Sequence, residues 1–175
     1  MNAMTQTAAP LATKTHAGGT VTAAYERELT LTRVFDAPPE TLYRAWTDPE
    51  LLKRFLAPHP WKITRTAMDV RPGGSSLFVM QGPDGAEIPC PGIYLELVPN
   101  EKIVTTDAYV SAWEPSANPF MTTVLTFERL EGNRTRYTAR CMHWTAESRQ
   151  QHEEMGFHEG WAQVTEQLAE LVAKI

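Results

Sequence analysis

The sequence has few cysteines and no long apolar stretch. Its 175 residues include only two cysteines, Cys90 and Cys141, and no CxxC pair. This excludes a disulfide-rich secreted scaffold, and we expect both thiols to be reduced. No apolar run approaches the roughly 18 residues that a membrane-spanning helix needs. We therefore expect a soluble, cytoplasmic protein without a membrane span.

An excess of basic charge is also missing. The chain has 16 lysine and arginine residues against 21 aspartate and glutamate residues, which gives a formal net charge of −5 at pH 7. The basic residues are scattered along the sequence and do not form a cluster. A nucleic-acid-binding protein normally carries a basic patch. We therefore expect no nucleic-acid partner.

The short motifs of common cofactor and nucleophile sites are absent. The sequence contains no GxSxG, no GxGxxG and no GxxxxGK[ST], so we expect no cofactor. Residues 152–158, HEEMGFH, place His152 and His158 six positions apart. A helical zinc pair needs a spacing of about four, so we expect no metal site. His158 is then either a solvated or hydrogen-bonded structural residue or a side chain at the mouth of a cavity.

The first 24 residues lack the apolar periodicity of a folded element. They are rich in alanine, threonine and glycine and hold one isolated leucine, Leu11. Such a segment buries too little apolar surface to offset the entropy lost on ordering. We predict a disordered N-terminal tail over residues 1–24 and a single domain over residues 25–175.

The rest of the sequence contains many strand and turn signals between two helical regions. A strand at 25–35 is followed by two short helices, at 39–48 and 50–55. Alternating apolar residues then predict six strands, at 61–70, 75–81, 88–98, 102–109, 122–130 and 134–143. A long amphipathic helix, capped by Ser148, follows with apolar residues at spacings of three and four. This order predicts an α+β fold, with a curved antiparallel sheet of about seven strands wrapped round the C-terminal helix.

Several short segments, taken in order, resemble a known family. They are VFDAP at 34–38, AWTDPELL at 45–52, DVRPGG at 69–74, PDG at 83–85, GIYLE at 92–96, KIV at 102–104 and GW at 160–161. Together they resemble the activator-of-heat-shock-protein-ATPase homologues, within the START-like helix-grip superfamily (SRPBCC). The resemblance implies a helix-grip fold with a ligand cavity between the sheet and the C-terminal helix. The family often has a large apolar or aromatic residue where this chain has Asp107.

Alternation along the strands indicates which side chains face inward. In the strand 134–143, arginines occupy even positions, so Tyr137, Ala139, Cys141 and His143 are expected inside. The resemblance supplies the inward positions of the other strands. The predicted cavity lining is Phe78, Met80, Asp107, Tyr109, Leu125, Phe127, His143, Phe157 and Trp161. Mostly apolar walls with a few polar groups are typical of a ligand cavity; the alternative is that these side chains fill a core.

Three functions stay open at this point. We expect the chain to bind a small hydrophobic or amphipathic molecule without a cofactor. The first alternative is a cyclase-, aromatase- or hydrolase-like enzyme in which Asp107, His143, His158 or a tyrosine acts as general acid or base. The second, implied by the family name alone, is a co-chaperone-like interaction module. The sequence also leaves open the ligand's identity and whether the chain forms a homodimer.

Overall fold

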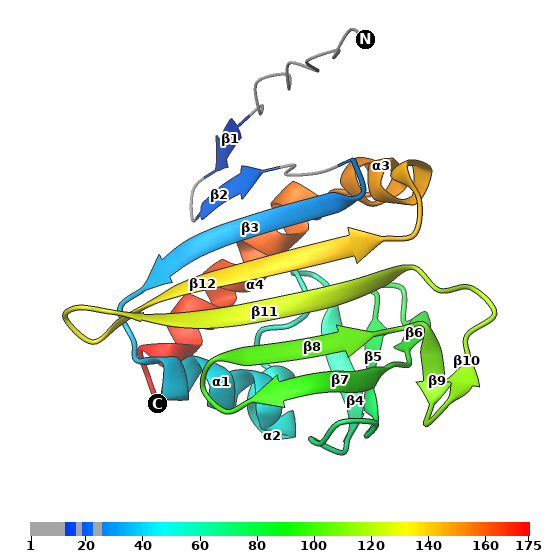
Figure 1. Cartoon of the computed structure of the whole chain (residues 1–175), viewed down its shortest axis with the longest axis horizontal. Coiled ribbons are helices and arrows are strands. Elements are labelled where there is room, and N and C mark those ends of the chain that lie inside the picture. Colours follow the sequence, from blue (N-terminus) through cyan, green and yellow to red (C-terminus); the bar gives the residue numbers. More distant parts are fainter. Residues whose placement is uncertain (1–12, 17–18, 23–25) are drawn as a thin grey trace, which may run out of the picture.

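The computed structural model describes residues 13–16, 19–22 and 26–175. A seven-stranded antiparallel sheet dominates it, formed by β1 (Thr13–His16), β2 (Gly19–Thr22), β3 (Glu28–Phe35), β7 (Ile93–Val98), β8 (Lys102–Thr106), β11 (Met121–Leu130) and β12 (Arg134–His143). The strands lie in the order β1-β2-β3-β12-β11-β8-β7 (Figure 1). The predicted α+β class and antiparallel sheet are confirmed.

Two short strands lie inside the segment that the sequence predicts to be disordered. Strand β2 pairs with β3, with Thr20 opposite Thr32 and Thr22 opposite Thr30, and β1 pairs with β2. The structure thus differs from the predicted tail at these residues. The physical reason is that the edge of β3 offers backbone N–H and C=O groups, and pairing with them needs no apolar periodicity. The remainder of the predicted tail lies outside the described residues.

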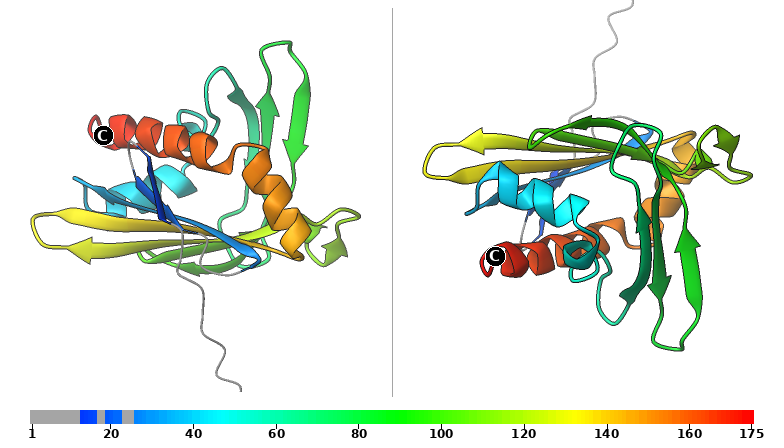
Figure 2. Two further views of the ribbon diagram at one scale, coloured as in Figure 1. Left: turned by 90° about the horizontal axis from the view of Figure 1, so that it is seen from above. Right: turned by 90° about the horizontal axis from the view of Figure 1, so that it is seen from below.

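A second, three-stranded sheet consists of β4 (Lys62–Met68), β5 (Ser76–Gln81) and β6 (Glu87–Cys90). Figure 2 shows that it stands at a steep angle to the large sheet, on the side that carries the C-terminal helix. The sequence predicts one strand over 88–98, whereas the structure divides it into β6 and β7. The chain changes sheet at Gly92, where a Cβ would lie 2.8 Å from the Thr106 carbonyl oxygen. Close approach of two backbones therefore requires glycine there.

The predicted strand 102–109 is also divided. Strand β8 ends at Thr106, and β9 (Tyr109–Ser111) pairs with β10 (Glu114–Pro115) in a separate hairpin. The interruption falls at Asp107, whose side chain accepts hydrogen bonds from the backbone N–H groups of Phe120 and Met121. A side chain that binds the neighbouring strand's backbone replaces part of the regular ladder.

The two predicted short helices are confirmed as α1 (Pro39–Thr47) and α2 (Pro49–Leu52). The C-terminal helical region is not the single helix that the sequence predicts. It consists of α3 (Ala146–Glu154) and α4 (Phe157–Val172), which are separated at Gly156, where φ is 96°. Thr145, rather than Ser148, caps α3 by accepting a hydrogen bond from the Ser148 N–H. Among the described residues, no helix is long and apolar enough to cross a membrane.

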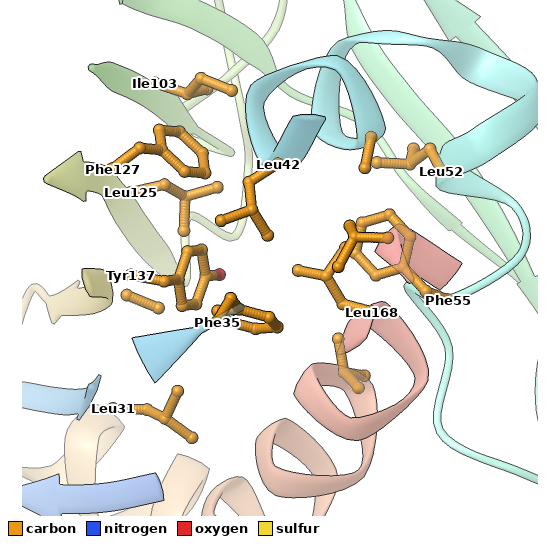
Figure 3. Packing of buried hydrophobic residues seen from close by; sticks show 14 of the residues in the cluster. Leu31, Phe35, Leu42, Leu52, Phe55, Ile103, Leu125, Phe127, Tyr137 and Leu168 are labelled. Atoms are coloured by element: carbon orange, nitrogen blue, oxygen red, sulfur yellow. The ribbon is translucent and has the colours of Figure 1, made fainter. Parts of the chain in front are cut away.

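The hydrophobic core lies between the large sheet and the helices α1 and α4. Figure 3 shows Leu125, Phe127 and Tyr137 from the sheet facing Leu42 of α1 and Leu168 of α4. The predicted inward alternation of β12 is confirmed, because all four odd-numbered residues from 137 to 143 are buried. The apolar stripe of α4 therefore packs against the concave face of the sheet.

The bend at Gly156 gives a matched pair of glycine substitutions. An alanine Cβ at Gly156 would meet only Glu159 Oε2, at 3.8 Å, so the backbone conformation alone opposes it. We expect Gly156→Ala to lower the free energy of unfolding by about 1–2 kcal/mol. Gly160 lies within α4 with open space around it, and Gly160→Ala should stabilise the protein by about 0.5–1 kcal/mol. Urea unfolding of both variants measures this, and equal effects would contradict the role of Gly156.

Candidate ligand-binding site

Four rings meet where β12 ends and α3 joins α4: Phe120, His143, His152 and Phe157. We call these residues the histidine cluster. The ring centroids of Phe120 lie 5.4 Å from His143 and 5.1 Å from His152. The His152 centroid lies 5.1 Å from that of His143 and 5.0 Å from that of Phe157. Residues from four different parts of the chain therefore form one group of rings.

A line of hydrogen bonds passes through both imidazoles. His143 Nε2 lies 2.9 Å from His152 Nδ1, and His143 Nδ1 lies 3.1 Å from the Arg27 carbonyl oxygen. The backbone N–H of His143 donates to the same carbonyl at 2.8 Å. The His143 side chain is thus held on both nitrogens and is only 4% exposed.

Burial keeps both imidazoles neutral near pH 7. It is the main cause that lowers the pKa of His143, with a further lowering from Arg149; the Arg27 carbonyl and Asp107 act in the opposite direction. Burial also lowers the pKa of His152, to about 4, helped by His143 and His158. A neutral imidazole has one N–H donor and one acceptor nitrogen.

Glu153 connects the two helices across the bend. It accepts hydrogen bonds from Arg149 Nη1 at 2.7 Å and from His158 Nε2 at 2.8 Å. His158 is 8% exposed, so it is the hydrogen-bonded structural residue of the two alternatives. The chain bends at Gly156, and His152 and His158 both contact Phe157. Within the described part of the chain, no group of three or more potential ligands is arranged to hold a metal ion.

Asp107 positions the loop that carries Phe120. Its carboxylate oxygens accept from the Phe120 N–H at 2.9 Å, and Oδ1 also accepts from the Met121 N–H at 3.0 Å. Burial raises the pKa of Asp107, and these bonds and His143 partly offset the rise. This predicted inward carboxylate thus meets its hydrogen-bonding needs within the protein.

One face of the three-stranded sheet lies toward Asp107. Burial raises the pKa of the Cys90 thiol to about 11, and the charge of Asp107 adds to the rise. Phe78 pairs with Cys90 across β5 and β6, and Met80 pairs with Ile88, so these side chains share a face. Phe78, Met80 and Cys90 are all half-buried, which leaves apolar surface on this face. The Cys90 thiol stays protonated at neutral pH and is a poor nucleophile.

The other predicted lining residues lie in three different places. Trp161 is half-buried and its ring centroid lies 5.8 Å from that of Phe157. Leu125 and Phe127 are buried members of the main core. Tyr109 contacts Trp113 within the β9–β10 hairpin, with centroids 5.8 Å apart. Of the predicted lining, the structure thus brings His143, Phe157 and Trp161 into one chain of ring contacts.

Sequence reasoning missed two members of the histidine cluster, Phe120 and His152. The sequence pattern places His152 and His158 on one continuous helix, and it therefore indicates no contact between His152 and His143. Gly156, between these two histidines, is the signal that could have revealed the bend. Phe120 follows a Pro/Ser/Asn-rich loop, and nothing in the sequence connects it to Asp107.

Two further polar atoms lie deeper in the core. The Tyr137 hydroxyl and the Trp46 indole N–H are buried and have no hydrogen-bond partner among the described residues. Their rings are stacked with centroids 6.3 Å apart. An unsatisfied buried donor costs about 1–3 kcal/mol, so these two donors favour an acceptor from outside the chain, such as a water.

A surface hollow lies at the other end of β11. Its lining residues are Pro39, Glu40, Pro99, Asn100, Glu101, Lys102, Thr126, Phe127, Glu128 and Arg129. It contains several charged side chains, including the Glu40–Arg129 ion pair. Met121 pairs with His143 at the opposite end of the strand. The charged hollow is therefore separate from the histidine cluster.

The chain is similar to proteins of known structure over most of its length. A protein from Nitrosomonas europaea shares 40% sequence identity with a TM-score of 0.82, over 85% of this chain and 96% of the other. A protein from Mycobacterium smegmatis shares 28% identity with a TM-score of 0.72, over 86% and 93% of the two chains. A protein from Chromobacterium violaceum shares 28% identity with a TM-score of 0.70, over 85% and 99%. These likenesses extend across nearly the whole of each relative.

A family profile also matches the sequence, whereas no curated protein does. The profile is described as Activator of Hsp90 ATPase homolog 1-like protein, and it matches residues 36–173. That range begins just before α1 and ends just after α4, so it includes every residue of the histidine cluster and all of the core except Leu29, Leu31 and Phe35 of β3. The chain belongs to the Activator of Hsp90 ATPase homolog 1-like family.

Proposed function

We propose that the protein binds a small hydrophobic or amphipathic molecule between the β5–β6 face and the α3–α4 bend, with its polar end at the histidine cluster. One observation carries this proposal. His152 Nε2 has no hydrogen-bond partner among the described residues, although Nδ1 of the same ring is bonded to His143. A ligand that contacts this nitrogen would complete the line of hydrogen bonds.

Half-buried apolar side chains on both sides of the proposed site support the proposal. Phe120 contacts His152 and Trp161 contacts Phe157, whereas Phe78, Met80 and Cys90 share the β5–β6 face. All five are half-buried, so a ligand can remove more of their surface from water. Burial of apolar surface contributes about 25 cal/mol per Å². A ligand that buries about 300 Å² of such surface would gain about 7 kcal/mol before the cost of association is subtracted.

The family supports the same kind of function. The helix-grip superfamily includes lipid-transfer domains, which hold apolar molecules between a curved sheet and a C-terminal helix. Fold alone does not transmit function. In this chain the argument therefore depends on the half-buried apolar side chains and on His152.

General acid–base catalysis is the second candidate. An enzyme of this kind needs two titratable groups within reach of one reacting atom. The Asp107 oxygens accept backbone N–H groups, and both His143 nitrogens have partners. Burial raises the pKa of Cys141 to about 12, so this thiol too stays protonated. Of the nitrogens of His143 and His152, only His152 Nε2 has no hydrogen bond to a described residue. One such group without a second titratable partner favours binding over catalysis. The co-chaperone alternative rests only on the family description.

The binding proposal predicts the effect of a larger side chain at Cys90. The neutral fluorescent probe N-phenyl-1-naphthylamine, whose amine carries one N–H donor, should gain fluorescence with the folded protein. We expect Cys90→Trp to weaken probe binding about tenfold or more, because the indole occupies ligand space. Val34→Trp is the matched control: Val34 is 47% exposed on β3, pairs with Arg136, and should leave probe affinity unchanged.

Fluorescence titration measures both affinities, and circular dichroism shows whether both variants are folded. Equal probe affinity in wild type and Cys90→Trp would place the probe elsewhere and contradict the proposal. Native mass spectrometry of the full chain purified without added ligand would show whether a small molecule accompanies it.

A further inference from the structure

The Arg27 carbonyl determines which nitrogen of His143 carries the proton. A carbonyl oxygen only accepts hydrogen bonds, and it lies 3.1 Å from Nδ1. Nδ1 must therefore be the N–H donor. A neutral imidazole has a single N–H, so His143 Nε2 carries a lone pair and acts as an acceptor.

The position of the proton on His152 follows from that on His143. Its Nδ1 lies 2.9 Å from the acceptor nitrogen of His143, so Nδ1 must carry the N–H. His152 Nε2 is then left with a lone pair. The ring is flanked by Phe120 and Phe157, with centroid distances of 5.1 and 5.0 Å, and neither phenyl ring can donate a conventional hydrogen bond.

We infer that His152 determines ligand specificity by selecting amphipathic molecules whose polar end donates a hydrogen bond, such as an alcohol or a phenol. This inference rests on the proposed function. An ether, an ester or an ionised carboxylate presents only acceptors, which the Nε2 lone pair cannot bind. Since the site is half-buried, a mismatched polar group would lose its water without gaining a partner.

The carboxylates near His143 and His152 already accept hydrogen bonds from other groups of the protein. Just after β8, Asp107 binds the N–H groups of Phe120 and Met121. On the helix side, Glu153 binds Arg149 and His158. His143 and His158, which lie on β12 and α4, both disfavour protonation of His152. His152 Nε2 therefore keeps its lone pair at every pH above the acid range.

The first test compares two matched probes that differ only at the polar end, para-octylphenol and para-octylanisole. Displacement of N-phenyl-1-naphthylamine at about pH 8, where the phenol is neutral, gives both affinities. We expect the phenol to bind wild type about five- to tenfold more tightly, as one net hydrogen bond allows. His152→Phe should remove this preference, so that the phenol and the anisole bind the variant with equal affinity. His59→Phe, at an exposed histidine outside the cluster, should keep it.

The outcomes separate the two proposals. Equal binding of phenol and anisole to wild type would overturn the specificity inference and leave the proposed function standing. Failure of both probes to bind would overturn the proposed function and the inference together. A preference that survives His152→Phe would assign the donor selectivity to another residue and would also overturn the inference.

The second test needs neither ligand nor variant. Nitrogen-15 NMR of the free full chain at about pH 8 should show His152 with a protonated Nδ1 and an unprotonated Nε2. The opposite tautomer would overturn the inference whatever the probes do. Because the pKa of folded His152 is about 4, Nε2 gains a proton as the pH falls through that value. The preference for the phenol should therefore hold above about pH 5 and be lost below about pH 4.

Discussion

The left-handed backbone of Gly156 divides the C-terminal segment into two helices, and the site depends on this division. With φ at 96°, the residue ends one helix and lets the next begin in another direction. Helix α4 can then keep its apolar stripe on the core, while α3 lies across the end of β12. A continuous helix would satisfy the first requirement, but it would not bring His152 against His143. The bend thus allows α4 to pack on the core and His152 to contact His143 at the same time.

The electrostatics of the site follow from burial together with a single backbone carbonyl. Burial favours neutral imidazoles, and the Arg27 carbonyl then sets the direction of the hydrogen bonds through both rings. The carboxylates that could disturb this order, Asp107 and Glu153, each bind groups of the protein itself. Consequently the cluster presents one lone pair among aromatic and apolar side chains, as a selective binding site requires.

Local sequence patterns predicted the strands well and the site only in part. Alternation predicted the buried side of β12 because a strand with one buried face has a strictly two-residue period. The same method missed β1 and β2, because β2 pairs with β3 and β1 pairs with β2, and backbone pairing of this kind needs no apolar periodicity. It also joined α3 to α4, because a single glycine inside a helical pattern is often tolerated. His143 and Phe157 were predicted, whereas Phe120 and His152 join them only through long-range contacts that no local pattern contains.

NMR mapping of a bound ligand tests most directly whether an amphipathic molecule binds at the histidine cluster. Side-chain resonances of the full-length protein would be followed while para-octylphenol is added. We expect the largest shifts on Phe120, His152 and Trp161, with smaller shifts on β6 round Cys90. Shifts centred on the charged hollow at Glu40 and Arg129, or no shifts at saturating phenol, would contradict it.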